Sequence, residues 1–228
     1  MIEKVSLFSR IEGGLVVSCQ ALEDEPLHSA DIMARMAEAA MIGGAVGIRC
    51  NGVEDTKAIR AKVDLPVIGL WKVGREGVYI TPTADHALSI IDAGADMVAL
   101  DATKMRANLE SDVLAIHKVG GLVMADISTY NEGLMAADVG VDCISTTLSG
   151  YTEWSPQQEV PDFDLVNRLS SRLSIPVIAE GRINTPELLE EAFAMGAFAV
   201  VVGSAITRPQ WITSNFIRRL PVKRNGAG

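Results

Sequence analysis

Polar or small residues follow short apolar runs at eight points along this 228-residue chain. In chain order these residues are Gln20, Arg49, Lys72, Asp101, Asp126, Thr147, Glu180 and Gly203. If the apolar runs are strands of one parallel barrel, their carboxyl ends meet at the end of the barrel where barrel enzymes build their sites. Two cations, three carboxylates and an amide would then face one ligand. The pattern therefore predicts a binding or catalytic site there.

Each of these residues also has a purely structural interpretation. Asp101 could cap a helix or anchor a loop, and Lys72 could be a solvated lysine at the start of a loop. Glu180 lies between Ala179 and Gly181, and a structural salt bridge to Arg49 or Arg182 is its main alternative. The joint pattern is more specific than any single member of it.

The last two apolar runs carry a second signal. Gly181-Arg182 follows the seventh run and Gly203-Ser204 follows the eighth, shortly before a helix expected to start near 207–209. In many barrels these two loops bind phosphate through backbone amides and a helix N-terminus. Glycine lets the backbone approach the phosphate closely. We therefore expect Gly181, Arg182, Gly203 and Ser204 to bind phosphate.

The elements that must position these residues follow a strand–helix rhythm. The apolar runs are continuous rather than alternating, as expected of parallel strands covered on both faces. Helical patterns lie between them, such as 184–196, where Thr185 can cap the start and Pro186 suits the first turn. Four Gly-apolar pairs, at 44–45, 94–95, 140–141 and 196–197, each close a helix before a strand. The runs span 15–20, 45–50, 66–72, 97–101, 122–127, 143–148, 176–181 and 199–205.

The sequence indicates an α/β chain folded as a single (β/α)8 barrel over residues 1–228. A doubly wound open sheet is the alternative, but it usually has five or six strands and need not place polar residues at nearly every strand end. We also expect a short N-terminal helix over about 1–13 and a mobile C-terminal tail over 221–228.

Composition excludes several classes of protein. The net charge of −9 argues against a general nucleic-acid surface. No run of eighteen apolar residues occurs, so we expect no membrane span. The acidic N-terminus lacks the apolar core of a secretory signal. Three cysteines without a CxxC motif favour a reducing cytoplasm over a disulfide framework.

Neither a metal site nor a serine nucleophile is expected. The three histidines, His28, His86 and His117, are scattered and form no cluster with acidic residues. His28 could line the site from the first βα loop, but we do not assign it to the site. No histidine is placed to activate Ser149, which we interpret as a ligand contact or part of a lid.

At this point the motifs identify a resemblance that runs from about residue 13 to 217. The segments SCQ (18–20), PVIGLWK (66–72), MADIST (124–129), STTLSGYT (145–152), AEGRINTP (179–186) and VGSAITRP (202–209) resemble the bacterial N-acetylmannosamine-6-phosphate 2-epimerase family. The resemblance implies a cofactor-independent TIM barrel, usually a homodimer, that acts in sialic acid catabolism. It implies a phosphorylated N-acetyl amino sugar as substrate.

The resemblance also implies roles for individual residues. The catalytic lysine matches Lys72, the catalytic glutamate matches Glu180 and the substrate-positioning aspartate matches Asp126. Substrate contacts match Gln20, Arg49 and Arg208, to which the strand-end pattern adds Thr147, and the phosphate-loop glycines match Gly181 and Gly203. The loops after Lys72 and after Thr103 are shorter than is usual in the family, so substrate entry could differ.

Epimerisation at C2 requires a proton-transfer group on each face of that carbon and a cation or donor near O1. Lys72 and Glu180 end the third and seventh runs, which face each other across an eight-strand barrel. Arg49 and partial burial should disfavour the ammonium form of Lys72, and Asp126 should orient the substrate or Lys72. Two alternatives remain: a Schiff-base lyase or aldolase that uses Lys72 as nucleophile, and a non-catalytic phosphosugar sensor.

The C-terminal segment PQWITSNFIRRL (209–220) carries Trp211, Ile212, Phe216, Ile217 and Leu220 along one helical face. We expect this helix to form the interface of a homodimer, although part of the face could simply cover the barrel.

Overall fold

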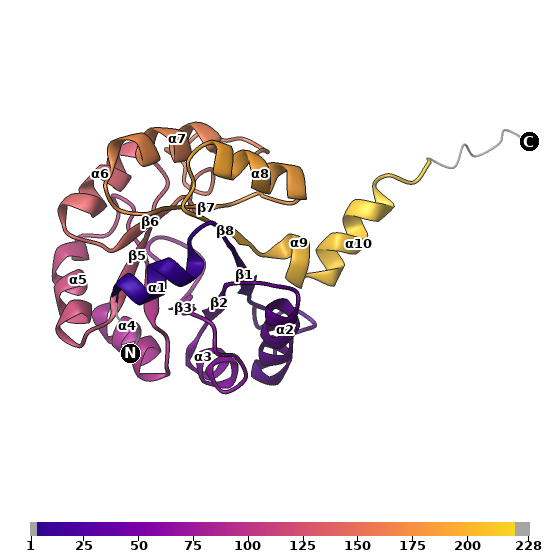
Figure 1. Ribbon diagram of the computed structural model, residues 1–228, viewed down its shortest axis with the longest axis horizontal. Helices are drawn as coiled ribbons and strands as arrows, with labels where there is room; N and C mark the ends of the chain where they lie inside the picture. Colours follow the sequence, from indigo (N-terminus) through magenta and orange to yellow (C-terminus); the bar gives the residue numbers. More distant parts are fainter. Residues whose placement is uncertain (1–3, 222–228) are drawn as a thin grey trace, which may run out of the picture.

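The chain forms a closed barrel of eight parallel strands, paired in the order β1-β2-β3-β4-β5-β6-β7-β8 and back to β1. The computed structural model describes residues 4–221. Leu15 of the first strand pairs with Val200 of the last, which closes the sheet (Figure 1). The strands are β1 Leu15–Cys19, β2 Gly47–Asn51, β3 Val67–Leu70, β4 Met97–Asp101, β5 Leu122–Asp126, β6 Cys143–Ser145, β7 Val177–Glu180 and β8 Ala199–Val202. The (β/α)8 barrel predicted from the sequence is confirmed.

Helices cover the outside of the barrel and follow the strands in turn (Figure 1). They are α2 Ala30–Ile42, α3 Val53–Arg60, α4 Ala84–Asp92, α5 Leu109–Lys118, α6 Tyr130–Asp138, α7 Phe163–Arg172 and α8 Pro186–Ala194. Two more helices follow the last strand, α9 Ser204–Thr207 and α10 Pro209–Ile217. The sequence predicted a helix start near 207–209, which α10 confirms, but it gave no indication of α9.

Local signals in the sequence explain where the helices begin and end. The side chain of Thr185 accepts a hydrogen bond from the amide of Leu188 and caps α8, and Pro186 is its first residue. The glycines that close α2, α4, α6 and α8 have φ angles of 96°, 106°, 86° and 94°, at Gly44, Gly94, Gly140 and Gly196. This left-handed conformation is costly for other residues, so glycine is needed at these turns.

The interior of the barrel is closed at one end by α1, Lys4–Ile11. Leu7, Phe8 and Ile11 of this helix belong to the same buried cluster as alternate strand residues such as Met124 and Ile178. The Phe8 and Phe198 rings meet edge to face, with centroids 6.0 Å apart. The helix expected over about 1–13 is therefore present over a shorter range, and residues 1–3 lie outside the described part of the chain.

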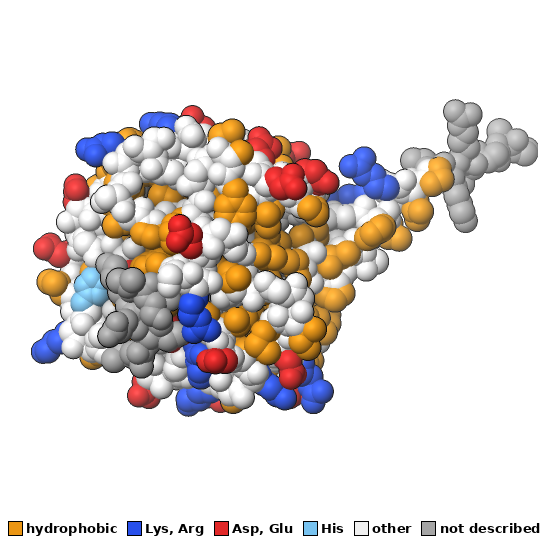
Figure 2. Space-filling model, viewed as in Figure 1, with side chains coloured by type: hydrophobic (Ala, Val, Ile, Leu, Met, Phe, Trp, Pro, Cys, Tyr) orange, Lys and Arg blue, Asp and Glu red, His pale blue; other side chains and the backbone are white. Residues whose placement is uncertain are grey.

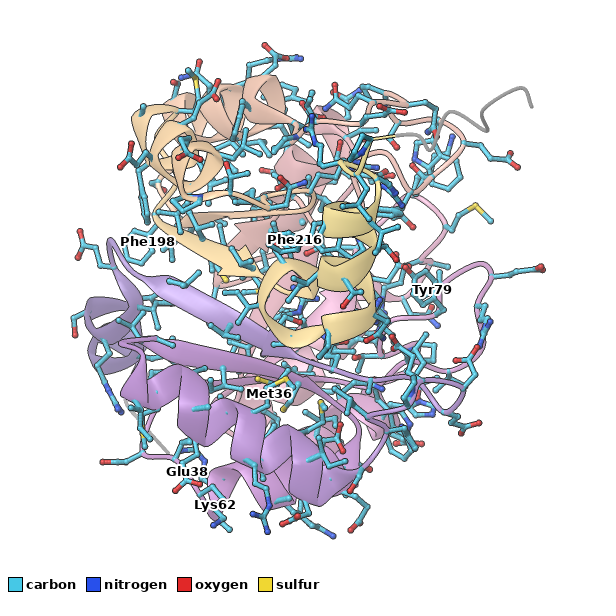
Figure 3. The ribbon with its side chains drawn as sticks, turned by 90° about the vertical axis from the view of Figure 1, so that its right-hand side faces the viewer. Met36, Glu38, Lys62, Tyr79, Phe198 and Phe216 are labelled. Atoms are coloured by element: carbon cyan, nitrogen blue, oxygen red, sulfur yellow. The ribbon has the colours of Figure 1, made fainter. Side chains whose placement is uncertain are left out.

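The last helix, α10, projects from the barrel rather than covering it (Figure 1). None of its residues is buried, and Phe216 is 74% exposed (Figure 3). Figure 2 shows hydrophobic side chains along this helix. The tail expected over 221–228 lies outside the described residues except for Pro221. Between residues 4 and 221, no helix has the length and apolar character needed to cross a membrane.

Candidate functional site

A cavity of about 1410 Å³ opens at the carboxyl ends of the strands. It is lined by ten of the eleven residues that the sequence assigned to the site: Gln20, Arg49, Lys72, Thr147, Glu180, Gly181, Arg182, Gly203, Ser204 and Arg208. The βα connections bring them together from strands that are far apart in sequence. The remaining residue, Asp126, lies beneath the cavity and is fully buried.

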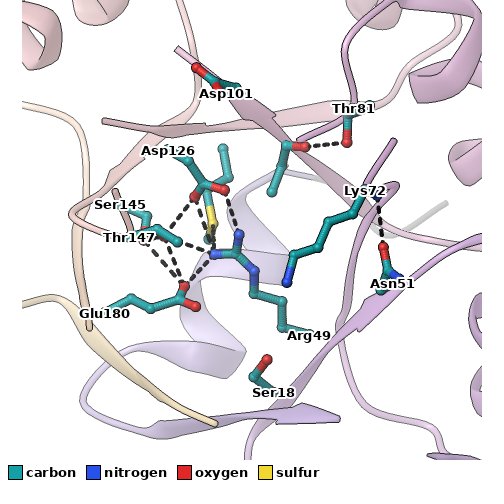
Figure 4. Close-up of polar contacts among 12 residues, drawn as sticks. Ser18, Arg49, Asn51, Lys72, Thr81, Asp101, Asp126, Ser145, Thr147 and Glu180 are labelled. Carbon is teal, nitrogen blue, oxygen red and sulfur yellow. Dashed lines mark hydrogen bonds and ion pairs between the residues drawn. The ribbon is translucent and has the colours of Figure 1, made fainter. Parts of the chain in front are cut away.

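Arg49, in β2, is the centre of the polar network below the cavity (Figure 4). Its side chain is 1% exposed and pairs with Asp126 through two hydrogen bonds, of 2.5 and 3.2 Å. It also forms an ion pair with Glu180 and donates to the Thr147 hydroxyl at 3.1 Å. Burial works against the guanidinium charge, but Asp126 and Glu180 outweigh it and raise the pKa of Arg49.

Asp126 acts on Arg49 rather than on Lys72 or the cavity. We expected this aspartate to orient the substrate or Lys72. Its hydrogen bonds go instead to Arg49 and to the Thr147 hydroxyl, the latter 2.8 Å away. The reason is geometric, because Asp126 still belongs to β5 and its carboxylate points into the barrel below the open end. Asp126 contributes to the site through these two hydrogen-bond partners and through its charge, which also raises the pKa of Glu180.

Lys72 lies two residues beyond β3, where the chain turns into a hairpin that pairs Lys72 with Ile80. Its backbone amide donates to Oδ1 of Asn51 at 2.8 Å. Burial lowers the pKa of Lys72 to about 8, and the charge of Arg49 adds to this effect. This direction agrees with the sequence-based expectation. In Figure 4 the side chains of Lys72 and Glu180 lie on opposite sides of Arg49.

Glu180 ends β7 with its carboxylate at the edge of the cavity. Besides Arg49, its Oε2 accepts a hydrogen bond from Thr147 at 3.0 Å. Burial raises the pKa of Glu180, and repulsion from Asp126 adds to this, against the opposing effect of Arg49. The salt bridge that we considered as its structural alternative is present. This salt bridge does not exclude a catalytic role, because a carboxylate beside a buried cation such as Arg49 can also transfer protons.

The Thr147 hydroxyl links the two carboxylates. It has one proton but lies within hydrogen-bond distance of both Asp126 and Glu180. The proton can be donated to only one carboxylate at a time. When Glu180 gains or loses a proton, the Thr147 hydroxyl can therefore rotate and donate its proton to the other carboxylate.

The two expected phosphate loops lie side by side on the cavity wall. Gly203 precedes α9, and its carbonyl accepts hydrogen bonds from the amides of Ile206 and Thr207 at 2.9 and 3.0 Å. Gly181 has a φ of 114°, which only glycine adopts readily.

Arg182 differs from expectation in the direction of its side chain. Its guanidinium donates to the carbonyls of Ser149 and Gly150, at 2.8 and 3.1 Å, and packs 4.5 Å from the centre of the Tyr151 ring. These contacts are possible because Gly150 has no Cβ, which would lie 2.4 Å from the guanidinium. Arg182 thus holds the loop between β6 and α7, and its backbone is the part available to a phosphate.

Gln20 and Arg49 each present a buried polar atom with no hydrogen-bond partner among the described residues. The atoms are Oε1 of Gln20, an acceptor, and Nε of Arg49, a donor. Because both residues line the cavity, a ligand could satisfy these atoms. Arg208 lies at the rim, where it pairs with Glu25 at 2.9 Å.

Two sequence interpretations are resolved by the structure. Asp101 does not line the cavity, and instead accepts hydrogen bonds from the amide and hydroxyl of Thr103, so it anchors a loop. Ser149, which we interpreted as a ligand contact or part of a lid, is instead buried, donates to Asp162 at 2.5 Å and does not line the cavity.

The cavity-lining residues that sequence reasoning missed include Asn51, Tyr79 and Gln158. Asn51 comes directly after the run that we ended at Cys50, so a strand extended by one residue would have included it. Tyr79 and Gln158 lie in loops and gave no spacing signal. His28 also lines the cavity. Within residues 4–221, no three His, Cys, Asp or Glu side chains are grouped so as to hold a metal.

Known proteins resemble this chain over nearly its whole length. The family model for N-acetylmannosamine-6-phosphate epimerase matches residues 33–221. A protein of Caldanaerobacter subterraneus named for the 2-epimerase activity is 51% identical over 240 residues, which cover 97% of each chain. One from Clostridioides difficile with the same name is 51% identical and covers 95% of this chain and 100% of its own.

A solved structure resembles the fold equally closely. The N-acetylmannosamine-6-phosphate 2-epimerase from Clostridium perfringens superposes with a TM-score of 0.91 at 49% identity, covering 93% of this chain and 96% of its own. A thiamine phosphate pyrophosphorylase from Pyrococcus furiosus, 19% identical with a TM-score of 0.63, shares the barrel fold alone.

Proposed function

Because this chain belongs to the N-acetylmannosamine-6-phosphate epimerase family, we propose that it is an isomerase that interconverts N-acetylmannosamine 6-phosphate and N-acetylglucosamine 6-phosphate. The observation that carries the proposal is the placement of Lys72 and Glu180 on either side of Arg49 in one cavity. Binding alone would not require two proton-transfer groups around a cation. We also propose that it acts in sialic acid and amino sugar catabolism, and in the cytoplasm.

The reaction that we propose takes place on the open-chain sugar, next to its C1 aldehyde. One of Lys72 and Glu180 removes the proton from C2. The electron pair of the C–H bond forms a C1–C2 double bond, and the carbonyl pair moves onto O1, which gives an enolate. The other group returns a proton to the opposite face of C2, which inverts the centre and restores the aldehyde. No other reactant is consumed, so the reaction needs no redox cofactor.

Arg49 would stabilise the negative charge on O1. Its guanidinium is held in place by Asp126 before substrate arrives, and its Nε–H has no partner in the described structure. A fixed donor of this kind stabilises developing charge without reorganisation during the reaction. Asp126 therefore supports catalysis by fixing Arg49.

The 6-phosphate would bind the loops after β7 and β8 through the backbone of Gly181, Arg182, Gly203 and Ser204. Gln20, Thr147 and Arg208 would contact the sugar. We expect N-acetylmannosamine without phosphate to bind far more weakly in calorimetry, and equal affinities would contradict this assignment.

A Schiff-base lyase remains the second candidate, because a lysine with a pKa of about 8 is also a suitable nucleophile. Borohydride added with substrate distinguishes the two. It would trap an adduct on Lys72 in a lyase and leave an epimerase unmodified.

We also propose that the protein is a homodimer that uses α10. This helix projects from the barrel with Phe216 and Ile217 exposed at 74% and 58%. Apolar surface of this kind is usually covered by a partner. The sequence left open whether the helix packs on its own barrel, and the absence of buried residues in α10 favours an interface between copies.

The decisive experiment is proton NMR of N-acetylmannosamine 6-phosphate with the protein in D2O. We expect conversion to the other epimer with deuterium incorporated at C2, without added metal or nucleotide. Activity lost in EDTA and restored by a metal would contradict the cofactor-independent reaction, and binding without exchange at C2 would identify a sensor.

A further inference from the structure

Two buried threonines hold the backbone at the two groups that would move the proton. We propose that Thr81 and Thr146 are positioning residues, Thr81 for the segment that carries Lys72 and Thr146 for Glu180. They are 0% and 3% exposed, and neither is among the described residues that line the cavity. Any effect on the chemistry must therefore pass through Lys72 or Glu180. The inference rests on the proposed function.

Thr81 forms hydrogen bonds with both the carbonyl and the amide of Trp71, the residue before Lys72. The amide of Thr81 donates to the carbonyl of Trp71 at 2.7 Å, and its hydroxyl accepts from the amide of Trp71 at 3.0 Å. The hydroxyl in turn donates to the carbonyl of Ala99 in β4 at 2.7 Å. Trp71 is thus tied to the wall of the barrel through one side chain. Together with the bond from Lys72 to Asn51, this fixes where the lysine leaves the backbone.

The conformation of Thr81 is itself unusual. Its φ of 49° lies in the left-handed region, which is an outlier for a β-branched residue. Strain of this kind persists only where the surroundings fix it, and it concentrates at functional sites. Here the buried Arg106 donates to the Thr81 carbonyl at 2.9 Å, and Arg106 is held by an ion pair with Asp112 at 2.7 Å. Arg106 and Asp112 therefore help to hold Thr81 in this conformation.

Thr146 holds Glu180 in a similar manner on the other side of the barrel. Its hydroxyl donates to the carbonyl of Glu180 at 3.0 Å and accepts from the amide of the same residue at 3.1 Å. The amide of Thr146 donates to the carbonyl of Ile178 at 3.2 Å. Both bonds fix the backbone of Glu180 without touching its carboxylate, which is left to Arg49 and Thr147.

Fixed backbones matter because proton transfer is sensitive to geometry. A displacement of about 1 Å can cost a hundredfold in rate. For Lys72 there is a second effect, because its pKa is lowered mainly by burial. A hairpin freed from Thr81 would let the ammonium group reach water and would return its pKa toward the ordinary value of 10.5. Loss of Thr146 would displace Glu180, whose charge raises the pKa of Lys72, so it should lower that pKa if it changes it at all.

The test compares Thr81→Val with Thr146→Val, so that each variant is the control for the other. Both lose a buried hydroxyl and keep the β-branched shape. Competitive labelling with acetic anhydride, read at the Lys72 peptide by mass spectrometry across pH, gives the Lys72 pKa without any need for activity. Turnover and KM for N-acetylmannosamine 6-phosphate are measured beside it.

We expect Thr81→Val to raise the Lys72 midpoint from about 8 and to lower kcat about tenfold to a hundredfold, with KM within about twofold. Thr146→Val should lower kcat similarly but should not raise the midpoint, because a displaced Glu180 can only weaken the attraction that raises the Lys72 pKa. Thr81→Ser and Thr146→Ser, which keep the hydroxyl, should behave as wild type. If Thr81→Val fails to fold, Thr81→Gly removes the hydroxyl at a position where glycine accepts the positive φ.

An unchanged Lys72 midpoint in a folded Thr81 variant would overturn the inference, as would equal shifts in both variants or wild-type turnover in either. Failure of the proposed function is distinguishable, because wild-type protein would then show no deuterium at C2 while the labelling still reports the Lys72 pKa.

Discussion

At the scale of single residues, the site is a buried cluster of charges held in place from below. Arg49 neutralises two carboxylates. Asp126 does not line the cavity, and Glu180 does. Removing one partner of such a buried set is costly because a charge is left uncompensated. The cluster therefore has its geometry before the substrate binds. Lys72 and Glu180 are the two members that we expect to exchange protons with the substrate.

We expect Lys72→Ala and Glu180→Ala each to abolish epimerisation while substrate still binds. A positioned acid or base is worth about 10²–10⁴-fold, and each variant leaves one face of C2 without one. The phosphate loops and Arg49 remain, so affinity should fall much less than rate. Each variant should still wash deuterium into the epimer whose C2 hydrogen faces its surviving group, which NMR of the separate sugars would show. Near-normal turnover in both variants would contradict the assignment of Lys72 and Glu180 as the proton-transfer pair.

We expect kcat/KM to fall as pH rises through about 8. The working free enzyme has one proton shared between Lys72 and Glu180, and with a Lys72 pKa of about 8 that proton is on the lysine below this pH. Above this pH the pair loses the shared proton, so no group can return a proton to C2 and epimerisation stops. The fall should be the same in both directions, because their ratio equals the equilibrium constant of the isomerisation. A rise through pH 8 would instead indicate that neutral Lys72 works without Glu180.

At the scale of elements, hydrogen bonds between loops and helix ends fix the cavity wall. Glu132 of α6 is the clearest case, because its carboxylate accepts bonds from the amides of Ser128, Thr129 and Lys104 and from the indole of Trp154. It thus joins the start of α6 to the loops that follow β4 and β6. Burial opposes the ionisation of Glu132, but the bonds from Ser128, Lys104 and Trp154 outweigh it and lower its pKa.

We expect Glu132→Gln to lower the free energy of unfolding at pH 7 by about 2–3 kcal/mol, because buried donors lose a charged acceptor. A group whose pKa is lowered on folding stabilises the protein above its unfolded pKa, and this stabilisation is lost as pH falls. The difference in the free energy of unfolding between wild type and Glu132→Gln should therefore become smaller as the pH is lowered. Urea denaturation at several pH values measures it, and Glu153→Gln, at an exposed site, should show no such loss.

The elements were also what the sequence predicted best. Continuous apolar runs and glycine-closed helices were sufficient to identify all eight strands, because burial on both faces leaves a strong pattern. The strand ends in turn located Arg49, Lys72 and Glu180. The direction of a side chain at the end of a strand has no such pattern, so the turn of Arg182 toward Ser149 and the partners of Asp126 were not foreseen. The positive φ of Thr81 depends on contacts with Trp71 that no local spacing reveals.

At the scale of the whole molecule, the barrel divides its two ends between different tasks. The carboxyl ends of the strands carry the cavity, and the opposite end is closed by α1 with an apolar cluster. The helix α10 begins at the cavity, where its Trp211 forms part of the lining, and then projects away from the barrel with Phe216 and Ile217 exposed (Figure 1). Its apolar residues are therefore free to meet a second copy of the chain.

We expect Phe216→Asp to convert a dimer to a monomer, because a buried, unpaired charge at the interface would be costly. Light scattering at micromolar concentration measures the mass. The control is Leu114→Asp, at a position that is 62% exposed on α5 and away from α10. A monomeric wild-type protein would contradict the homodimer.

The position of α1 has a consequence for how the protein is made. This helix precedes every strand and is synthesised first, yet its Leu7, Phe8 and Ile11 pack against residues from strands as late as Ala199 and Val201. The backbone just after it also donates from Gly13 to the carbonyl of Phe198. The docking surface for α1 is therefore incomplete until β8 has left the ribosome. Leu7, Phe8 and Ile11 therefore lack part of their packing surface until the last strand has been synthesised.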